Sequence, residues 1–290
     1  MSITIGLMGG LGNQLFQLFT LISYSIDSKK PFYIEDKPIT CGDRKKYYWN
    51  TRLLQNLKEF IQPPLENNML CQEPFFHYEA IPRLIDPSMK IHAKLEGYFQ
   101  SYKYFEKHKN IILRMIQLKQ TQHYVKEKVA PYLPTNTFEQ VVSLHFRVGD
   151  YVKLQDYHPL ISVKYYEKAL EQFLIDTDMI IKKKMFILYF CEENDLAYVN
   201  EKINYLKQNA KFQSLTFIKV PSHLDDWEQM ILMSLCQHHI IANSTFSWWG
   251  AYLRERDHGL VYYPSTWFGP AIVDKKMDDL FLDGWKKIMC

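Results

Sequence analysis

The chain has 290 residues, which is too long for one ordinary domain and too short for three, so its length predicts two medium-sized domains. Hydrophobic residues make up 47% and charged residues 23%, a composition that allows a substantial core and excludes a disordered chain. The 35 basic and 32 acidic residues are interspersed, with a net charge of +3 and no basic tract, which excludes nucleic acid as a partner.

Cysteines and apolar segments indicate the compartment. The five cysteines are odd in number and form no C-x-x-C pair, which predicts free thiols in a reducing compartment and no zinc site. The N-terminus lacks a basic segment and is predicted as a strand rather than a signal peptide. Apolar runs such as residues 185–191 are too short to cross a bilayer. We expect a cytoplasmic protein, free or in peripheral contact with a membrane.

The N-terminal residues are predicted to form a strand, a helix and a second strand. An apolar strand over residues 2–8 leads into the glycine-rich segment 9–13, and a helix over residues 14–25 carries apolar residues near helical spacing. Residues 31–36 supply a second strand that ends in acids. This order predicts a parallel sheet.

The following stretch is less regular. Residues 40–95 carry several prolines among aromatic residues and are predicted to be irregular, whereas residues 95–105 indicate a strand, a turn and the start of a helix that continues to about Lys128. Prolines and polar residues at 131–137 predict a linker. We therefore place the N-terminal domain at 1–136 and the C-terminal domain at 137–290.

A second series of strands and helices follows the predicted linker. The predicted strands are 141–145, 185–190, 215–220, 239–242 and 261–264, and the predicted helices are 165–173, 227–236 and 246–253. The fold class is α/β with two Rossmann-like domains. Ligands are expected at the carboxyl ends of the strands.

The segment Gly9-Gly-Leu-Gly-Asn-Gln14 lies where a strand gives way to a helix. Glycines there let backbone N–H groups approach an anion or a sugar, and a tight structural turn is the alternative. Gly10 and Gly12 match a dinucleotide-binding fingerprint, but Leu15 stands at its third glycine position. The amides of Asn13 and Gln14 favour binding.

The segment His145-Phe-Arg-Val-Gly-Asp-Tyr151 follows an apolar strand. Strand alternation places His145 and Arg147 on one face at the carboxyl edge of the sheet. The guanidinium of Arg147 is suited to a pyrophosphate because it keeps its charge and bonds two oxygens at once. The alternative is a structural ion pair between Arg147 and Asp150.

The segment Ala242-Asn-Ser-Thr-Phe-Ser-Trp-Trp-Gly250 places an amide and hydroxyls at a helix N-terminus. Such residues are ordinary N-caps, and the same groups bind anions. The acid pairs Asp176/Asp178 and Asp225/Asp226 are interpreted as a solvated turn and a helix start, so no metal site is predicted.

Four segments together resemble the α-1,2-fucosyltransferases of glycosyltransferase family 11, over nearly the whole chain. They are Gly9–Gln14, Gly97–Gln100, His145–Tyr151 and Leu232–Ala251. The resemblance implies a GT-B architecture, with two Rossmann-like domains facing a central cleft, the acceptor on the N-terminal side and GDP-fucose on the C-terminal side. It also implies an inverting transfer without metal or cofactor, commonly to the 2-hydroxyl of a galactose-type residue in a glycan.

The resemblance also implies roles for individual residues. Arg147 would bind the pyrophosphate, His145 and Asp150 would position it, and the glycine loop with Asn13 would face the reacting centre. Many members carry a second arginine where this chain has Val148. The remaining implied donor-site residues are Gly10, Gly12, Gln229, Asn243, Ser244, Thr245 and Ser247, with Gln229 standing where the family has an acid that reads guanine.

Three questions stay open at this point. The candidates for the base that deprotonates the acceptor are Asp150, Asp156 and His158. The alternative functions are a catalytically silent nucleotide-sugar or glycan-binding protein, a glycosyltransferase that uses another nucleotide sugar, and a nicotinamide-dependent reductase. The sequence does not define the oligomeric state.

Overall fold

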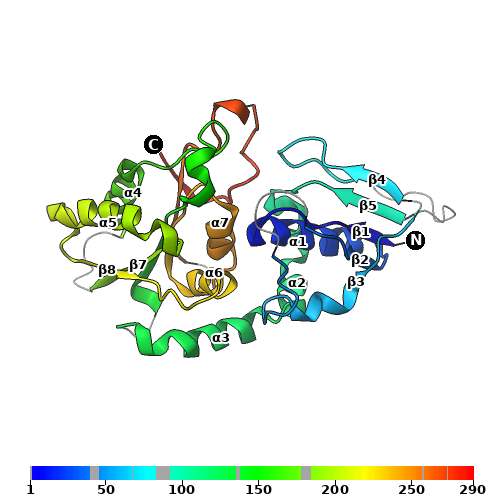
Figure 1. Cartoon of the computed structure of the whole chain (residues 1–290), viewed down its shortest axis with the longest axis horizontal. Coiled ribbons are helices and arrows are strands. Elements are labelled where there is room, and N and C mark those ends of the chain that lie inside the picture. Colours follow the sequence, from blue (N-terminus) through cyan, green and yellow to red (C-terminus); the bar gives the residue numbers. More distant parts are fainter. Residues whose placement is uncertain are drawn as a thin grey trace. The chain divides into compact units, whose positions relative to one another are not determined.

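The computed structural model describes residues 2–39, 46–66, 68–82, 92–134, 138–177, 184–256, 258–272 and 274–290. The chain forms two compact units (Figure 1). Unit 1 comprises residues 1–121 and 275–282, and unit 2 comprises residues 122–274 and 283–290. The division falls inside helix α3 (Leu118–Val129), earlier in the chain than the predicted linker, and a short C-terminal segment returns to unit 1.

Unit 1 is built on a five-stranded sheet with the order β3-β2-β1-β5-β4. All of its neighbouring strands are parallel. Its elements are β1 (Ile3–Ile5), α1 (Leu11–Ser28), β2 (Phe32–Glu35), β3 (Ile61–Gln62), β4 (Asn68–Gln72), β5 (His92–Glu96) and α2 (Lys109–Met115). Strands β3 and β4 lie in the stretch that we predicted to be irregular, so that prediction is wrong in part.

Helix α1 packs most of its residues into the interior of unit 1. It starts three residues earlier and ends three residues later than predicted, because Gly10 caps its N-terminus and Lys29 adopts a left-handed conformation after its end. Phe16 and Phe19 both pack against the ring of Phe105, at centroid distances of 5.9 and 5.4 Å. The position of the loop that precedes α1 is thereby set by buried aromatic contacts.

Unit 2 is built on a six-stranded sheet with the order β11-β10-β9-β6-β7-β8, and all of its neighbours are parallel. The strands are β6 (Val141–His145), β7 (Met185–Phe190), β8 (Leu215–Lys219), β9 (His238–Ile240), β10 (Val261–Pro264) and β11 (Lys286–Ile288). The helices are α4 (Val163–Asp176), α5 (Leu196–Gln208), α6 (Asp226–Leu235) and α7 (Thr245–Tyr252). The prediction of two α/β domains with parallel sheets is therefore confirmed; α5 and β11 were not predicted.

The strand order of unit 2 determines where its ligand site is expected. Counting from β6 as the first strand, the order is that of a Rossmann sheet, in which the direction of winding reverses between the first and fourth strands. These strands are β6 and β9, which pair directly through Val142 and His238. Ligands of such sheets bind beyond the carboxyl ends of the strands at this switch point.

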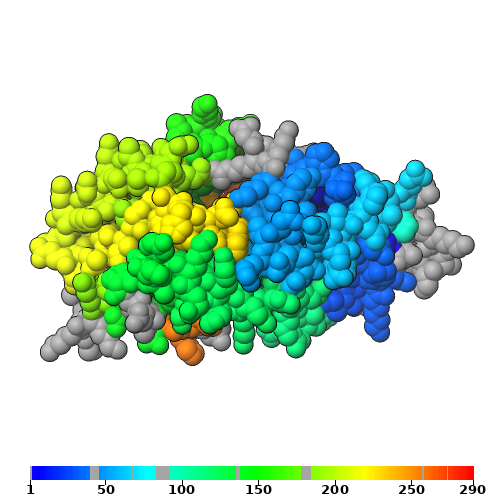
Figure 2. Space-filling model, turned by 60° about the horizontal axis from the view of Figure 1, so that its bottom comes forward, coloured from blue at the N-terminus to red at the C-terminus, as the bar shows by residue number. Residues whose placement is uncertain are grey.

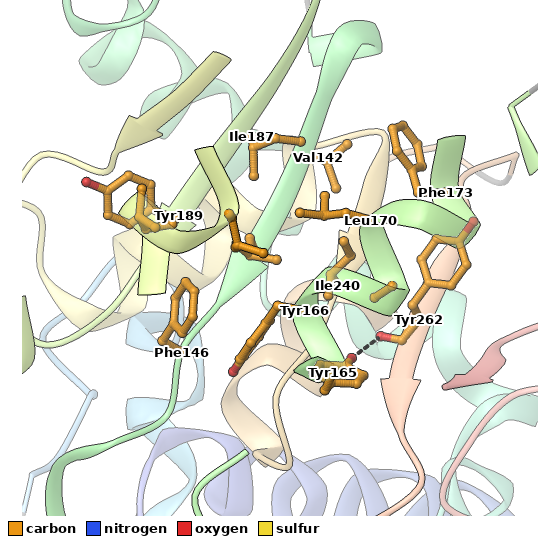
Figure 3. Close-up of a cluster of buried hydrophobic side chains, with 14 of the residues drawn as sticks. Val142, Phe146, Tyr165, Tyr166, Leu170, Phe173, Ile187, Tyr189, Ile240 and Tyr262 are labelled. Carbon is orange, nitrogen blue, oxygen red and sulfur yellow. Dashed lines mark hydrogen bonds between the residues drawn. The ribbon is translucent and has the colours of Figure 1, made fainter. Parts of the chain in front are cut away.

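A buried cluster in unit 2 fixes the elements around that point (Figure 3). Tyr165, on α4, donates its hydroxyl to the carbonyl oxygens of Ile241 and Tyr262, at 2.6 and 3.1 Å. Tyr166 donates its hydroxyl to the carbonyl of His145 at 3.0 Å. Both rings are almost completely buried, so α4 anchors the ends of three strands through apolar packing and satisfied hydrogen bonds.

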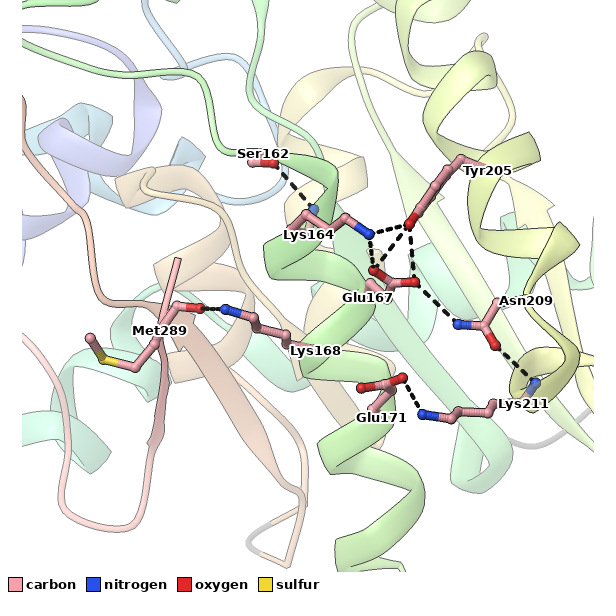
Figure 4. A network of polar contacts seen from close by, with 9 residues as sticks. All are labelled: Ser162, Lys164, Glu167, Lys168, Glu171, Tyr205, Asn209, Lys211 and Met289. Carbon is pink, nitrogen blue, oxygen red and sulfur yellow. Dashed lines mark hydrogen bonds and ion pairs between the residues drawn. The ribbon is translucent and has the colours of Figure 1, made fainter.

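The outer side of α4 carries a polar network (Figure 4). Glu167 accepts hydrogen bonds from the Lys164 ammonium at 2.9 Å and from the Asn209 amide at 3.2 Å, and the Tyr205 hydroxyl also contacts it. These contacts join α4 to α5 and the turn after it. Because Lys164 and Tyr205 are exposed, the network contributes little to stability and mainly defines how the two helices face one another.

Helix α3 lies along the surface of unit 2 beside the segment that contains α6 (Figure 2). The Lys128 ammonium contacts both carboxylate oxygens of Glu228, at 2.6 and 2.8 Å. Glu228 also accepts a hydrogen bond from the backbone N–H of Asp225 as part of a capping box at the start of α6. This buried carboxylate therefore has a structural role. No helix among the described residues is long and apolar enough to span a bilayer.

We expect unit 2 to lose stability in mild acid, because β9 contains two neighbouring histidines. Burial, with a smaller effect from the charge of Arg254, lowers the pKa of His238 to about 4 and that of His239 well below its ordinary value. Below pH 6.5 His238 is protonated in the unfolded chain but stays neutral in the folded chain. The free energy of unfolding therefore falls as the pH decreases from 6.5 towards 4. His238 alone accounts for roughly 3 kcal/mol of this loss.

The measurement is the thermal midpoint of the wild type and of His238→Gln between pH 7.5 and 4.5. We expect the midpoint of the variant to depend less steeply on pH, whatever its absolute value. Equal slopes would contradict the assignment to His238.

Candidate functional site

Arg147 lies just beyond the carboxyl end of β6, where the sequence placed it. Its Nη1 donates to Glu192 Oε1 at 2.6 Å, its Nη2 pairs with Asp150 Oδ1, and its guanidinium carbon lies 4.7 Å from the centroid of the Tyr151 ring. The side chain is only 12% exposed. The ion pair with Asp150, which was the alternative to pyrophosphate binding, is therefore present. A second carboxylate and an aromatic face also contact the guanidinium, and we call this set of contacts the Arg147 clamp.

The turn after Arg147 explains the glycine of the segment. Gly149 has a φ of 40°, in the left-handed region, and a Cβ there would lie 3.3 Å from Glu192 Oε1. Its backbone N–H donates to Asp195 Oδ2 at 2.9 Å. Glycine thus allows the chain to turn tightly past the Arg147–Glu192 pair, and Asp195 holds the turn from the loop after β7.

Tyr151 connects the two strands of the switch point. Its hydroxyl donates to the carbonyl of Asn243 at 3.1 Å, which joins the loop after β6 to the loop after β9. The His158 ring stacks on the Tyr151 ring, at a centroid distance of 4.9 Å and an angle of 17°. The predicted residues Arg147 and Asn243 are therefore brought together through Tyr151, which was not among the predicted site residues.

Asn243 is 1% exposed, and its amide nitrogen donates to the carbonyls of Pro159 and Trp267 at 2.9 and 3.3 Å. Both donors are thus used to hold neighbouring loops against the end of β9. Asn243 therefore stabilises the loops around the end of β9. Direct contact of its side chain with a ligand remains a prediction.

The N-terminus of α7 presents the hydroxyl residues of the second segment. Ser244 is the N-cap and accepts from the backbone N–H of Phe246 at 3.3 Å, and Ser247 donates to the carbonyl of Ser244 at 3.3 Å. Thr245 is half-buried in the first turn. A Cβ at Gly250 would come within 2.7 Å of Met233 Cβ, so this glycine lets α7 pack closely on α6. Capping is therefore observed, and the remaining N–H groups of the turn point out of the helix, as an anion requires.

His145 and Gln229 lie at the border of this region. His145 is 7% exposed, and its ring lies 5.5 Å from that of Phe246 at the start of α7. Gln229 is half-buried in the first turn of α6 and donates to the carbonyl of Leu224 at 3.0 Å. The neighbouring carboxylate of Glu228 is already paired with Lys128. The role of Gln229 in reading a base stays a prediction.

The glycine loop of unit 1 forms a second candidate site at the carboxyl end of β1. Asn13 lies in the first turn of α1, and its Oδ1 accepts from Gln100 Nε2 at 3.0 Å. Gln17 holds the strand end by bonding both the N–H and the carbonyl of Met8, each at 2.9 Å. Gly10 is the N-cap of the helix, and a Cβ added there would meet no atom within 4 Å. Gly12 is buried within the first turn. Asn13 and Gln100, from two of the four quoted segments, therefore meet where unit 1 reverses its winding between β1 and β5.

Two residues bear on the alternative of a nicotinamide site. Leu15, at the third glycine position of the fingerprint, is completely buried in the core. Glu35 is the buried carboxylate at the end of β2, and it pairs with Lys37 and Lys94 at 2.9 Å each. Burial raises the pKa of Glu35, but the hydrogen bonds from both lysines outweigh it and leave the pKa below its ordinary value. Glu35 is therefore engaged within the sheet, whereas Asp36 is exposed.

Two of the acids considered for a metal, Asp176 and Asp225, have partners within the protein. Asp225 caps α6, and Asp176 accepts from the Tyr262 hydroxyl at 2.6 Å and pairs with Lys286 at 2.8 Å; Asp178 lies outside the described residues. Asp176 is thus not the solvated turn that we predicted. Within the part of the chain that the structure describes, no three His, Cys, Asp or Glu side chains form a group suited to a metal ion.

Among the candidates for a base, Asp156 is exposed, His158 stacks on Tyr151, and Asp150 is held by Arg147. Glu192 was not among the predicted site residues. It is an acid two residues after the buried strand β7, which is a signal in the sequence, but only the pairing of β6 with β7 shows that it faces Arg147.

A guanidinium and a helix N-terminus at the switch point of a Rossmann sheet are groups suited to a phosphate-bearing ligand such as a nucleotide. The model of Glycosyl transferase family 11 matches residues 2–289 of this chain. The chain therefore belongs to glycosyl transferase family 11, and it is a glycosyltransferase. The family inferred from the four segments is confirmed.

Known proteins of similar sequence carry related names. The chain is 26% identical to the alpha-1,2-colitosyltransferase of Escherichia coli over 291 residues, covering 92% of this chain and 93% of that protein. It is 25% identical to the galactoside 2-alpha-L-fucosyltransferase of Caenorhabditis elegans over 304 residues, covering 99% and 79%. The solved structure of the ADP-heptose heptosyltransferase II of E. coli is similar with a TM-score of 0.49, at 12% identity, over 99% of this chain and 93% of that one.

Proposed function

We propose that this glycosyltransferase transfers L-fucose from GDP-fucose, with inversion, to the 2-hydroxyl of a galactose-type residue in a glycan. The observation that carries the proposal is the Arg147 clamp beside the N-terminus of α7 at the switch point of unit 2. The name of the C. elegans relative supports fucose and a galactoside acceptor, because both occur in it.

The proposed transfer needs no metal ion and no cofactor. Negative charge builds on the departing GDP as its bond to fucose breaks, and a fixed guanidinium together with the N–H groups of a helix N-terminus stabilises such charge. Asp150, Glu192 and Tyr151 hold the guanidinium in place before the donor binds, so little reorganisation accompanies the reaction. Unit 2 therefore binds the donor, and unit 1 contributes Asn13 and the acceptor side.

A second candidate differs in the donor sugar. The E. coli relative is named for the transfer of colitose. It is 26% identical to this chain with 93% of its length covered, against 25% and 79% for the fucosyltransferase from C. elegans. Both candidates share the reaction type, so they are distinguished by the nucleotide sugar alone.

We expect nucleotide release from GDP-fucose, in the presence of a galactose-terminated oligosaccharide, to continue in excess EDTA. The experiment compares GDP- and UDP-sugars, including GDP sugars other than GDP-fucose, with EDTA and again with added Mg²⁺ or Mn²⁺.

The calorimetric affinity for GDP should exceed those for UDP and ADP, by a modest factor because Gln229 lacks the charge of a carboxylate.

Three results would each contradict a different part of the proposal. Loss of nearly all turnover in EDTA, restored by metal, contradicts metal independence. Faster release from another GDP sugar favours the second candidate. Neither transfer nor slow hydrolysis with any donor would indicate a catalytically silent binding protein.

A further inference from the structure

A stacked aromatic pair, in which Phe75 is exposed and His77 is half-buried, follows the edge strand β4 of the sheet in unit 1. Phe75 and His77 lie in the loop after β4, and their rings are stacked with centroids 5.0 Å apart at an angle of 12°. Phe75 is 56% exposed, although most phenylalanines of the described residues are at least partly buried. Because the rings are stacked on one another, the flat surface that they offer at the carboxyl edge of this sheet, here called the platform, is that of the exposed Phe75 ring, with His77 behind it.

The backbone on one side of the platform is fixed by Glu73. Its N–H donates to the carbonyl of Glu96 at 2.8 Å, and its Oε2 accepts from the N–H of Tyr98 at 2.8 Å. A Cβ at Gly97 would lie 2.4 Å from Glu73 Cβ, which shows how closely the two loops approach. Burial raises the pKa of Glu73, and the backbone N–H groups of Phe99 and Tyr98 partly offset this effect.

The other side of the platform is held by the C-terminal segment that belongs to unit 1. Asp279 accepts from the N–H of Tyr78 at 3.1 Å and also pairs with Lys103. Lys275 places its ammonium 4.9 Å from the centroid of the Phe76 ring. An exposed aromatic residue on a loop held at so many points loses little conformational entropy when it binds a ligand.

The platform is linked indirectly to the site at the end of β1. The Tyr78 ring contacts the Tyr104 ring at 4.9 Å, and Tyr104 contacts the Phe99 ring at 5.3 Å. The next residue, Gln100, donates to Asn13 at 3.0 Å. The aromatic pair is thus joined to Asn13 within unit 1 by ring contacts from Tyr78 to Phe99 and by the backbone between Phe99 and Gln100.

The chemistry around the rings favours a sugar over other occupants. A pyranose ring presents a flat face of C–H groups ringed by hydroxyls, and the pair offers a flat apolar surface with a carboxylate at its rim, since Glu79 Oε1 lies 3.5 Å from His77 Nε2. Glu79 is 50% exposed and would repel an anionic lipid surface. A stable protein interface needs on the order of 1,200 Å² in total, far more than two rings present.

We propose that the Phe75–His77 pair binds one sugar ring of the acceptor glycan, with Glu79 accepting a hydrogen bond from a sugar hydroxyl. This inference rests on the proposed function, because it assigns the acceptor of that reaction to a surface of unit 1. The pair affects acceptor affinity and not the donor.

The test compares wild type, Phe75→Ala and Phe75→Trp. We expect Phe75→Ala to raise the KM for a galactose-terminated oligosaccharide about tenfold, as the loss of one good ring contact does, and Phe75→Trp to restore it. GDP affinity and the slow hydrolysis of donor without acceptor should stay at the wild-type level. Binding of lactose and longer galactosides in the presence of GDP, followed by saturation-transfer NMR, gives a readout that does not depend on turnover.

Tyr132→Ala is the matched control, because Tyr132 is 54% exposed and its ring lies 4.9 Å from that of His223 in unit 2. It should leave the acceptor KM unchanged. If Phe75→Ala behaves like this control, or if the wild type binds none of the galactosides, the inference is wrong. If the wild type binds galactosides through Phe75 but transfers no sugar, the inference stands and the proposed reaction fails.

Discussion

Arg147→Lys lowers the turnover of transfer by about 10²–10³-fold, while the affinity for GDP falls much less. Lysine keeps one positive charge but loses the planar fork, and with it the ability to bond two oxygens at once. Stabilisation that depends on this geometry acts mainly where charge develops on the departing GDP. Arg147→Ala should reduce turnover at least as much.

The structure makes this prediction sharper, because the guanidinium is already held by two acids. Glu192 and Asp150 each bond one end of it, and Tyr151 covers its face. Lysine cannot keep both ion pairs with the same geometry, so some loss of stability is expected as well. The thermal midpoint, the GDP affinity and kcat must therefore be measured on the same preparations.

Glu192→Gln is the matched control for this clamp. It keeps a hydrogen-bond acceptor for Arg147 Nη1 and removes a negative charge near the proposed diphosphate, so we expect GDP to bind more tightly while kcat falls by less than in Arg147→Lys. If Arg147 were only a structural partner of the acids, the lysine variant would melt at a lower temperature and keep near-normal turnover in its folded fraction. A well-folded lysine variant that turns over within a few-fold of the wild type would falsify the leaving-group role.

Asn13→Asp is expected to lower turnover by about 10²-fold with little change in stability. The carboxylate keeps the acceptor for Gln100 Nε2, and a negative charge in the first turn of α1 is favourable to the helix. The substitution removes the amide donor of Asn13 and places a negative charge next to the proposed reacting centre. Transfer should therefore suffer while the fold does not.

Gln100→Met separates the two roles of the contact between Asn13 and Gln100. It removes the hydrogen bond to Asn13 Oδ1 but leaves the Asn13 side chain, so we expect a smaller loss of turnover than in Asn13→Asp. The measurements are kcat, acceptor KM and the thermal midpoint of both variants. Wild-type turnover in Asn13→Asp would show that the glycine loop only shapes the turn between β1 and α1.

Several elements were predictable because their residues carry a local pattern. The run Val141 to His145 is buried throughout and rich in apolar residues, as a central parallel strand must be. By contrast, β4 exposes Met69 and Leu70, and β11 is a three-residue strand at the edge of its sheet. Edge strands have weak patterns because only part of their surface is buried, so neither β4 nor β11 could be found.

The limits of the two units were decided by contacts remote in sequence. Residues 275–282 join unit 1 through Asp279, which bonds Tyr78 and Lys103, although they follow most of unit 2 along the chain. The prolines at 131 and 134 are ordinary linker signals, yet the division lies within α3. Prolines and polar residues indicate where the chain turns, whereas the limits of a compact unit depend on which residues pack against one another.

The sequence by itself determined the family, the parallel α/β class and the placing of Arg147, Asn13 and the Ser244 cap at the ends of strands and starts of helices, because these depend on residues close together in the chain. Only the tertiary structure decided their partners. Glu192 reaches Arg147 because β6 and β7 are neighbours in one sheet, and Tyr151 reaches Asn243 because β6 and β9 are. Strand order is set by burial of the whole sheet, and no local pattern encodes it.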